Sequence, residues 1–465
     1  MENINREHPE YVARKAMWKK YGDLYSGGEQ IREQASDYLV RRNKEPKEVY
    51  QERLSRVFYE NYIGSIIDWY AATLLRREPV LVADGTNESG KQFFNGFAEN
   101  CDLRGSSLAD FFRRQIANAL VYGGTYIALD FPRFTEPAPN RAAEDATGRS
   151  RAFLVEYTPD EVINWNYAAD GNLSWVVIRT SCLRQEKVTD SEWKQETRWI
   201  YYDREHFQIY TRAEGTEPPS EIVLVDEGKH GLAAQQRTPV FRLGVSDGLW
   251  LMNKAALLQL EHFNKSNALA WALTMGLFAT PVVYSDREWS QIVGESYYIQ
   301  LGPQDKFGWT EPEGHVFQIA ADNLQRLKDE IYRVCYLMGQ AAGPQASNVA
   351  QSGLSKQRDF SITQEVLRAY GDAVKDTIKQ VLGAIELARA DGLAIDVLGL
   401  DDFDIGDFSS ELDDAHKLLA LGIGSETLKK QLFKKLAFKY LCDAKQDIKT
   451  QISTEIDASF ETSRN

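Results

Sequence analysis

The amino-acid sequence predicts an α+β fold that is mainly helical. Long stretches carry apolar residues three and four positions apart, which indicates amphipathic helices, whereas residues 151–225 change to a period of two, which indicates strands. These strands form a meander after a run of helices, which is the order of an α+β fold. With 465 residues, 43% of them hydrophobic and 26% charged, the chain is long enough for two or three cores and has an ordinary globular composition.

The first half of the chain is predicted to begin with helices and to end with antiparallel strands. Pro79 stops one helical segment. Ser107-x-x-Asp110 is a capping box that opens another helix, which Gly123 ends. The expected elements are helices over residues 9–24, 46–75 and 108–122, strands over 79–83, 125–129, 153–157, 175–179, 199–202 and 207–210, a helical turn at 158–161 and a surface loop over 131–150.

The second half is predicted to return to helices, with one small α/β segment between two of them. The expected elements are a helix over 248–279, strands over 281–284, 297–300 and 315–319 with a short helix at 285–293, helices over 322–339, 356–387 and 411–420, and a basic helix after the N-cap Ser425. The polar tail after Thr450 is expected to be frayed.

A loop rich in small and polar residues connects two of the strongest helix patterns. Residues 340–353 contain no His, Cys or carboxylate, so no catalytic set is expected there. Connections of this length without secondary structure are uncommon in compact domains and are usually functional or disordered. The composition suits sliding contact with a partner that is not held tightly.

The formal net charge of −14 restricts how the chain could meet nucleic acid. A protein that wraps DNA tightly is normally basic, because it neutralises phosphates. An acidic chain would contact DNA weakly or through a small basic patch; alternatively, the acidity only keeps the protein soluble. The basic helix could touch DNA or acidic neighbours, although such a run is usually a solvated face. Its lysines are Lys429, Lys430, Lys434, Lys435 and Lys439.

The cysteines and the apolar segments indicate a reducing compartment and no membrane anchor. The four cysteines are widely separated and form no Cys-x-x-Cys pair, so free, buried thiols are expected. The charged first residues lack the apolar core of a signal peptide. The longest apolar run, residues 266–283, is interrupted by Pro281 and is short for a membrane span. A cytoplasmic origin is therefore expected.

A spacing that resembles a phosphate-binding P-loop occurs at residues 85–91, which read Gly-Thr-Asn-Glu-Ser-Gly-Lys after a short predicted strand. Residues 126–130 could then pose as the accompanying Walker B strand. However, Gln92 cannot supply the hydroxyl that binds magnesium, and Glu88 would place a negative charge beside the phosphates. A surface turn is the favoured interpretation, and a P-loop NTPase built on Lys91 remains the enzyme alternative.

No catalytic, metal-binding or cofactor-binding set is predicted. The six histidines are scattered, and none has the spacing of a metal-binding motif. The acidic pairs Asp401-Asp402 and Asp413-Asp414 are expected at solvated helix ends or turns. Nothing in the sequence argues for the burial that acid–base chemistry by paired carboxylates needs. The chain is therefore not expected to be an enzyme.

The order of the predicted parts resembles that of portal proteins of tailed bacteriophages. Helices come first, followed by a mixed β region, a helix, a small α/β insert, a returning helix, a loop, a long helix and a helical carboxy-terminal part. Several phrases are similar to family segments; they are residues 59–70 followed by 77–79, residues 108–132, residues 157–165 and residues 419–427. The resemblance covers nearly the whole chain and rests on the combined order.

The resemblance implies a portal fold that forms a dodecameric ring at one capsid vertex, through which double-stranded DNA enters and leaves. The implied localisation is the virion, after assembly in the host cytoplasm. An acidic channel would repel DNA and so lower friction on it. The implied regions are a wing (1–247), a first stem helix (248–279), a clip (280–320), a second stem helix (321–339), a tunnel loop (340–356), a long tunnel or wing helix (357–400) and a helical crown and tail (401–465).

The resemblance also implies partners and contact residues, but no cofactor and no membrane. The partners are other copies of the chain, double-stranded DNA, the terminase large subunit, the major capsid and scaffolding proteins, and a head–tail connector or adaptor. Lys356 and Arg358 would contact phosphates, unless they form an ordinary exposed helix start. The remaining implied residues are Gln345, Ser347, Asn348, Gln351 and Ser352 at the narrowest point of the channel, and Asp286, Arg287, Glu288, Asp305 and Lys306 in the clip that docks the terminase. A different head–tail connector ring is the structural alternative.

Overall fold

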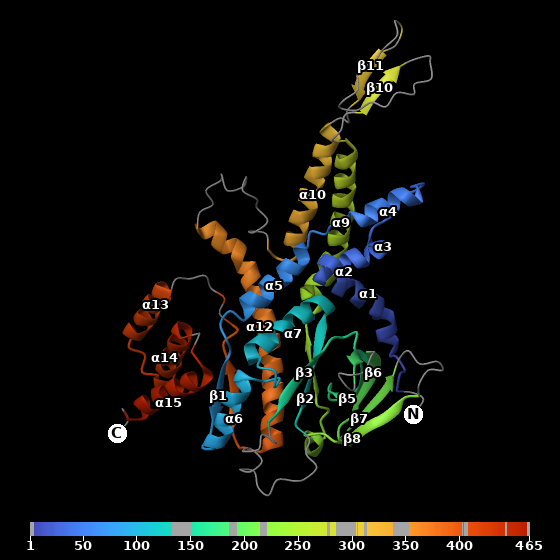
Figure 1. Ribbon diagram of the computed structural model, residues 1–465. Helices are drawn as coiled ribbons and strands as arrows, with labels where there is room; N and C mark the ends of the chain where they lie inside the picture. Colours follow the sequence, from blue (N-terminus) through green and yellow to red (C-terminus); the bar gives the residue numbers. More distant parts are fainter. Residues whose placement is uncertain are drawn as a thin grey trace. The chain divides into compact units, whose positions relative to one another are not determined.

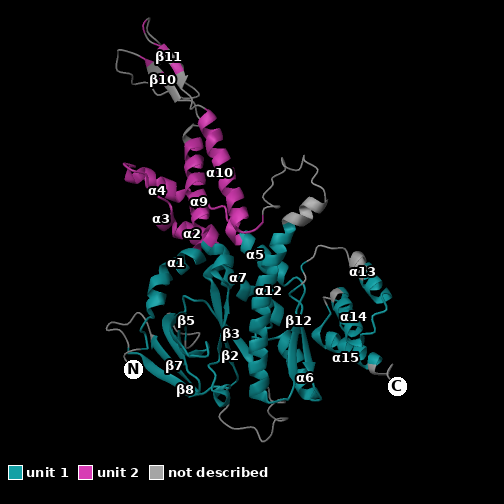
Figure 2. Ribbon diagram, turned by 180° about the vertical axis from the view of Figure 1, so that it is seen from behind, with its two compact units in different colours: residues 1–22, 65–253, 351–465 teal, residues 23–64, 254–350 magenta. Residues whose placement is uncertain are grey.

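The chain forms two compact units, which Figure 2 distinguishes by colour. Unit 1 comprises residues 1–22, 65–253 and 351–465, and unit 2 comprises residues 23–64 and 254–350. The fold is α+β and mainly helical, which confirms the predicted class. The computed structural model describes residues 4–132, 151–185, 193–213, 221–276, 280–284, 304, 306–310, 314–337, 353–401, 403, 408–441 and 444–462, and the structural observations are confined to these.

The described part of unit 1 contains antiparallel sheets whose strands come from distant parts of the sequence (Figure 1). The largest sheet has the strand order β4-β5-β6-β7-β8, a second has the order β3-β2-β9, and a third pairs β1 with β12. The strands are β1 (Val80–Asp84), β2 (Gly124–Asp130), β3 (Phe153–Tyr157), β4 (Val162–Tyr167), β5 (Leu173–Arg184), β6 (Lys194–Tyr202), β7 (His206–Ala213), β8 (Val223–Lys229), β9 (Val240–Gly244) and β12 (Ala394–Leu398).

The hydrophobic core of the largest sheet includes aromatic residues from the first helix, α1 (Pro9–Ser26). Tyr11 and Trp18 of this helix are buried in the same cluster as Trp199 of β6. The Trp199 side chain is fully buried, and its indole N–H donates a hydrogen bond to Oδ1 of Asn5 over 3.0 Å. Burial of these large rings supplies apolar stabilisation, and the single polar group that Trp199 takes into the core is satisfied.

Helices cover the other sheets of unit 1. The prediction for residues 107–123 is confirmed, because Ser107 Oγ accepts the Asp110 N–H over 3.1 Å and Gly123 ends the helix with a φ of 85°. The 37-residue helix α12 contacts both β9 and β12. The helices are α5 (Tyr62–Leu74, which begins in unit 2), α6 (Glu88–Glu99), α7 (Leu108–Tyr122), α12 (Gly353–Arg389), α13 (Phe408–Ala420), α14 (Glu426–Tyr440) and α15 (Gln446–Thr462), with short 3-10 turns at Ala233–Gln235 and Asp247–Leu249.

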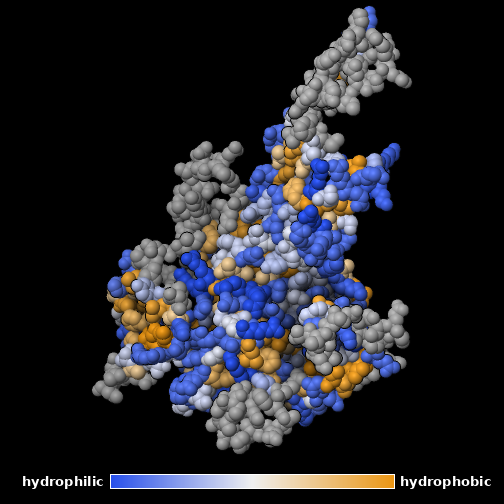
Figure 3. All heavy atoms as spheres, in the orientation of Figure 1, coloured by the Kyte–Doolittle hydropathy of each residue, from blue (hydrophilic) through white to orange (hydrophobic). Residues whose placement is uncertain are grey.

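The carboxy-terminal helices expose part of their apolar surface. Figure 3 shows hydrophobic residues gathered over α13 and α14. On α14, Phe433 and Tyr440 are exposed, whereas Lys434 is buried and donates to Asp457 Oδ2 of α15 over 2.7 Å. Lys430 also lies near this carboxylate, at 3.8 Å. Two of the predicted basic residues thus face an acidic neighbour in the same chain.

Unit 2 is built around two antiparallel helices, α9 (Leu251–Gly276, of which the first residues belong to unit 1) and α10 (Gly314–Val334). The chain between them contains the antiparallel pair β10 (Thr280–Tyr284) and β11 (Lys306–Thr310). Lys265 donates to Asn323 Oδ1 over 3.0 Å, which fastens α9 to α10. The short helices α2 (Gly28–Glu33), α3 (Ala35–Tyr38) and α4 (Lys47–Ser55) complete the unit.

Amide side chains along α9 hold the preceding segment of unit 2. Gln259 donates to the Glu60 carbonyl over 2.7 Å, Asn264 donates to the Tyr38 carbonyl over 3.0 Å, and Asn267 donates to the Phe58 carbonyl over 2.9 Å. A side-chain amide can donate to a backbone carbonyl that has no partner in a helix or strand. These three amides therefore supply hydrogen bonds to carbonyl groups that lack such a partner.

The predicted single helix over residues 46–75 is wrong, because two helices, α4 and α5, occupy this range and residues 56–61 separate them. Asn61 explains the new helix start, since its Oδ1 accepts the Gly64 N–H over 2.9 Å in the manner of an N-cap. Its amide nitrogen also donates to the Tyr25 carbonyl over 2.8 Å. The local cap and the tertiary hydrogen bond to Tyr25 together outweigh the apolar period that runs across the break.

Two other predicted elements are wrong. The strand expected at 315–319 is the start of α10, whose helix begins at Gly314. The tail after Thr450 is not frayed in the described residues, because α15 continues to Thr462. Its first residue, Gln446, donates from Nε2 to the Leu81 carbonyl over 2.6 Å, and this buried hydrogen bond anchors the helix on β1.

The remaining differences concern small elements. The expected helical turn at 158–161 is a hydrogen-bonded turn, in which the Glu161 N–H donates to the Thr158 carbonyl over 3.0 Å. Strands β4, β8, β9 and β12 were not predicted from the sequence. The expected elements at 285–293 and 297–300 and most of the loops at 131–150 and 340–353 lie outside the described residues.

Candidate functional site

Most of the contact residues implied by the portal resemblance lie outside the described residues. Lys356 and Arg358 belong to the first turns of α12, and their side chains are likewise not described. Lys306 is the exception: it is exposed on β11, opposite Tyr284 of β10. The residues outside are Gln345, Ser347, Asn348, Gln351 and Ser352 of the tunnel loop and Asp286, Arg287, Glu288 and Asp305 of the clip. Their roles stay predictions.

In the P-loop-like segment, residues 85–87 form a turn after β1 and residues 88–91 begin α6; the connection between α12 and β12 packs against both glycines. Asn87 caps α6 by accepting the Gly90 N–H on its Oδ1 over 3.0 Å, so this N–H is not free to cradle a phosphate. A Cβ added to Gly85 or Gly90 would lie within 3 Å of the Leu393 side chain. The two glycines therefore allow the Leu393 side chain to pack closely against this segment. This packing explains why glycine occurs at both positions, and no bound nucleotide is needed to explain it.

The Lys91→Ala variant is expected to leave nucleotide binding unchanged, because Lys91 pairs with Glu88 of the same helix over 2.9 Å and Asn87 occupies the loop. Glu88 is exposed and Lys91 is half-buried, so loss of this pair should reduce the free energy of unfolding by no more than ~1 kcal/mol. Titration of ATP with magnesium, followed by calorimetry on both proteins, checks this. Binding by the wild type that the variant abolishes would restore the NTPase interpretation.

The buried histidines have structural partners. Burial lowers the pKa of His230, whose Nε2 lies 2.9 Å from the Asp203 carbonyl. Burial also lowers the pKa of His262, which stacks edge-on against Tyr62 and lies 3.6 Å from the Glu60 carboxylate. Lower pKa values keep both rings neutral near pH 7. Within the described ranges, no group of three or more His, Cys, Asp or Glu side chains is placed to hold a metal ion.

The described cysteines are free thiols, as predicted, but one of them is not buried. Cys101 and Cys335 are buried, and burial raises the pKa of each thiol to about 12, so both are poor nucleophiles. Cys182 is exposed near the end of β5. No described helix is long and apolar enough to cross a lipid bilayer.

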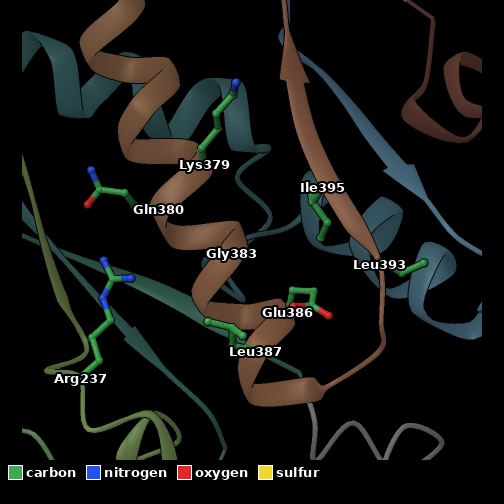
Figure 4. A pocket seen from close by; sticks show the side chains of 8 residues that line it. All are labelled: Arg237, Lys379, Gln380, Gly383, Glu386, Leu387, Leu393 and Ile395. Carbon is green, nitrogen blue, oxygen red and sulfur yellow. The ribbon is translucent and has the colours of Figure 1, made fainter.

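A hollow of about 350 Å³ lies over the outward face of α12 in unit 1 (Figure 4). Gly383 forms its floor, and an added Cβ there would meet no atom within 4 Å. The absence of a side chain at this one position therefore opens the helix surface. The lining residues are Arg237 from the segment before β9, Lys379, Gln380, Gly383, Glu386 and Leu387 from α12, and Leu393 and Ile395 from the chain that enters β12.

Arg237 is the unusual group in this hollow. Its guanidinium lies 4.7 Å from the centre of the buried Phe241 ring. Burial lowers the pKa of Arg237, because its charge is partly removed from water. The Asp170 carboxylate acts on this charge electrostatically and raises the pKa of Arg237, but less than burial lowers it. Among the described residues no direct hydrogen bond or ion pair uses the five N–H donors of the guanidinium.

The other charged side chains of the hollow already have direct partners. Lys379 donates to Asp396 Oδ1 over 2.7 Å, and this contact lowers the pKa of Asp396. Glu386 Oε1 accepts the Gly392 N–H over 3.0 Å. Leu387 at the rim is 56% exposed, which leaves an apolar group uncovered beside Arg237. The sequence carries no signal for this hollow, since its residues come from three separated segments.

Comparisons with known proteins show a weak structural likeness. No protein-family model matches the chain, and no curated protein matches it. The chain is similar to a chain of the structure "Neck of empty GTA particle computed with C6 symmetry", with 14% identity, a TM-score of 0.46 and coverage of 85% of this chain and 95% of that chain.

Two further structures are similar to the chain. One is "Virion of native gene transfer agent (GTA) particle", with 13% identity, a TM-score of 0.41 and coverage of 86% of this chain and 96% of that chain. The other is "Neck of native GTA particle computed with C12 symmetry", with 11% identity, a TM-score of 0.36 and coverage of 78% and 86%. At these values the likeness stands as an observation, and the functional proposal rests on the chain's own features.

Proposed function

We propose that this chain is the portal protein of a tailed bacteriophage or prophage. Copies would form a dodecameric ring at one capsid vertex, and double-stranded DNA would pass through its central channel during packaging and ejection. The ring would dock the terminase and later a head–tail connector, and it would contact the capsid and scaffolding proteins. It would act as a conduit, and the motor's chemistry would reside in the terminase.

The observation that carries this proposal is the construction of unit 2. Two antiparallel helices, α9 and α10, leave and rejoin the rest of the chain, and the β10–β11 pair stands between them in sequence. This is the order expected for a stem that carries a clip. The 37-residue helix α12 then follows the segment 338–352, which is the position expected for a tunnel loop before a long tunnel helix.

Two features of the chain fit a passive channel. The net charge of −14 opposes tight DNA binding, which would stall a moving polymer. The segment before α12 contains small and polar side chains without carboxylates, which suits sliding contact. In this proposal Gln345, Asn348 and Gln351 line the narrowest point, and Lys306 lies on the surface that meets the terminase.

The purified protein is expected to assemble into a dodecameric ring with a central hole. A head-to-tail contact between identical subunits leaves one unused surface on each side until the ring closes. Electron microscopy of negatively stained particles shows the hole, and native mass spectrometry gives the copy number. A closed ring of another symmetry would favour the head–tail connector alternative. A protein that remains monomeric at high concentration, also in the presence of scaffolding protein, would contradict the proposal.

A further inference from the structure

The hollow over α12 contains one cation, Arg237, for which the described chain supplies no direct hydrogen bond or ion pair and only a longer-range attraction to Asp170. A half-buried guanidinium has lost part of its hydration, and the Phe241 ring replaces only a fraction of it. An incoming anion would regain that lost interaction through charge-assisted hydrogen bonds. The forked geometry of arginine fits a planar carboxylate with two parallel bonds.

The surroundings of Arg237 favour a carboxylate on a protein over a nucleic-acid backbone. Binding to a DNA backbone usually recruits several free cations. Here Lys379 is neutralised by Asp396, and Glu386 adds a negative charge within the hollow. A DNA backbone would therefore find only one available cation here, whereas a single carboxylate needs only one.

The apolar residues of the hollow indicate that the ligand also carries an apolar side chain. Leu387 is 56% exposed at the rim, Ile395 is half-buried, and Gly383 leaves the floor open. A side chain that covers Leu387 would remove apolar surface from water at the same time as an adjacent carboxylate reaches Arg237. The matching ligand is an acidic residue next to an apolar one on a folded protein surface.

We propose that this hollow receives a carboxylate, with a neighbouring apolar side chain, from a second copy of this chain. The inference rests on the proposed function, because a ring brings identical copies together in a head-to-tail arrangement. The chain has 68 acidic and 54 basic residues, so each copy carries a surplus of acidic groups for its neighbour. The hollow is thus one half of a subunit contact, with Arg237 as its charged centre.

The experiment compares the dissociation of the ring on dilution for the full-length wild type, Arg237→Ala, Arg237→Lys and Gly383→Leu, measured by mass photometry. Removal of a charge-assisted hydrogen bond costs ~1.5–3 kcal/mol, so Arg237→Ala is expected to raise the dissociation midpoint roughly 10- to 100-fold. Arg237→Lys keeps the positive charge but cannot form two parallel hydrogen bonds to a carboxylate, so its dissociation midpoint should rise less than that of Arg237→Ala. Gly383→Leu keeps Arg237 but fills the floor, and it should weaken the ring as well.

The matched control is Arg184→Ala. Arg184 is an exposed arginine of unit 1 that already pairs with Glu196 of the same chain, over 3.2 Å. Its loss should leave the midpoint unchanged. Thermal unfolding by circular dichroism verifies that the variants fold, and Arg237→Lys keeps the test valid if the alanine variant does not.

The outcomes separate this inference from the proposed function. Rings of Arg237→Ala and Gly383→Leu that dissociate at the wild-type midpoint would overturn the inference and leave the proposed function standing. A cryo-electron microscopy map of the wild-type ring with only solvent, or another protein, at the guanidinium would do the same. A wild type that forms no ring overturns both.

Discussion

Replacing Gly371 with alanine is expected to destabilise unit 1 strongly, although alanine is the better helix former. Gly371 lies within α12, where an exposed glycine-to-alanine change would ordinarily stabilise a helix by ~1 kcal/mol. At this position, however, the added Cβ would lie 1.9 Å from the carbonyl oxygen of Leu400. The obstacle is backbone, and it belongs to a tight turn in which Leu400 has a φ of 62° and Gly399 a φ of 96°. That turn cannot move aside without breaking the register of β12.

The expected loss for Gly371→Ala is about 3 kcal/mol, at the upper end of what overpacking costs. Gly383→Ala on the same helix is the matched control, because its added Cβ would meet no atom within 4 Å. The control should gain about 0.5–1 kcal/mol, since only the helix preference and the reduced freedom of the unfolded chain act there. Urea unfolding followed by circular dichroism measures both. Shifts of the same sign in the two variants would contradict the close packing of α12 against the turn after β12.

The Arg53→Ala variant is expected to have the second large effect, in unit 2. Arg53 and Glu45 form an ion pair over 2.9 Å, with only 4% and 3% of their side chains exposed. The carboxylate also accepts the Arg42 N–H over 3.0 Å, so it holds the turn before α4. Removing the guanidinium leaves a buried, unpaired charge, which costs about 3–5 kcal/mol.

Two comparisons make this prediction specific. Arg32→Ala removes an exposed ion pair with Glu29 and should change the free energy of unfolding by less than ~1 kcal/mol. The double variant Glu45→Leu/Arg53→Met should recover much of the lost stability, because two apolar side chains of similar volume leave no buried charge. Chemical unfolding of these three variants and the wild type measures the free energy of unfolding of each. A double variant as unstable as Arg53→Ala would locate the loss in packing instead of charge.

The same pair predicts a pH dependence. Burial by itself would raise the pKa of Glu45, but hydrogen bonds from the Arg42 N–H and from Arg53 lower it below its ordinary value of 4.5. A carboxyl whose pKa is lower in the folded state stabilises that state above its unfolded pKa, and this contribution is lost as the pH falls through the folded pKa. The difference in stability between the wild type and Arg53→Ala should therefore be full at neutral pH and shrink in acid below the ordinary value.

The parts of the fold that the sequence predicts are those where local pattern and tertiary packing agree. Helix α7 is an example, because Ser107 and Gly123 form its ends with bonds inside the same segment. The break before α5 has a local signal, the cap that Asn61 provides for Gly64, but the tertiary bond that holds Asn61 has none, because Tyr25 lies 36 positions away. Helix α15 has no comparable local signal, because the hydrogen bond that anchors it joins Gln446 to Leu81, 365 positions earlier in the sequence.

The candidate sites show the same division. For the P-loop-like spacing, Gln92 and Glu88 favour a surface turn; in the structure only residues 85–87 form the turn, and residues 88–91 begin α6 behind the Asn87 cap. The hollow around Arg237 could not be anticipated, because its charge is noteworthy only once Lys379 is seen to be paired and Gly383 is seen to leave space. An unpaired charge is a property of three-dimensional neighbours, and no local pattern encodes it.

The pairing of β1 with β12 affects how the protein folds during its synthesis. The register runs from Val80 opposite Leu398 to Asp84 opposite Ala394, so the two strands leave the ribosome far apart in time. At about 5–20 residues per second, β1 waits roughly a quarter of a minute to a minute for its partner. During that interval the Val-Leu-Val segment at 80–82 presents an open edge to other nascent chains. Slower synthesis would therefore lengthen the time during which this strand edge stays unpaired.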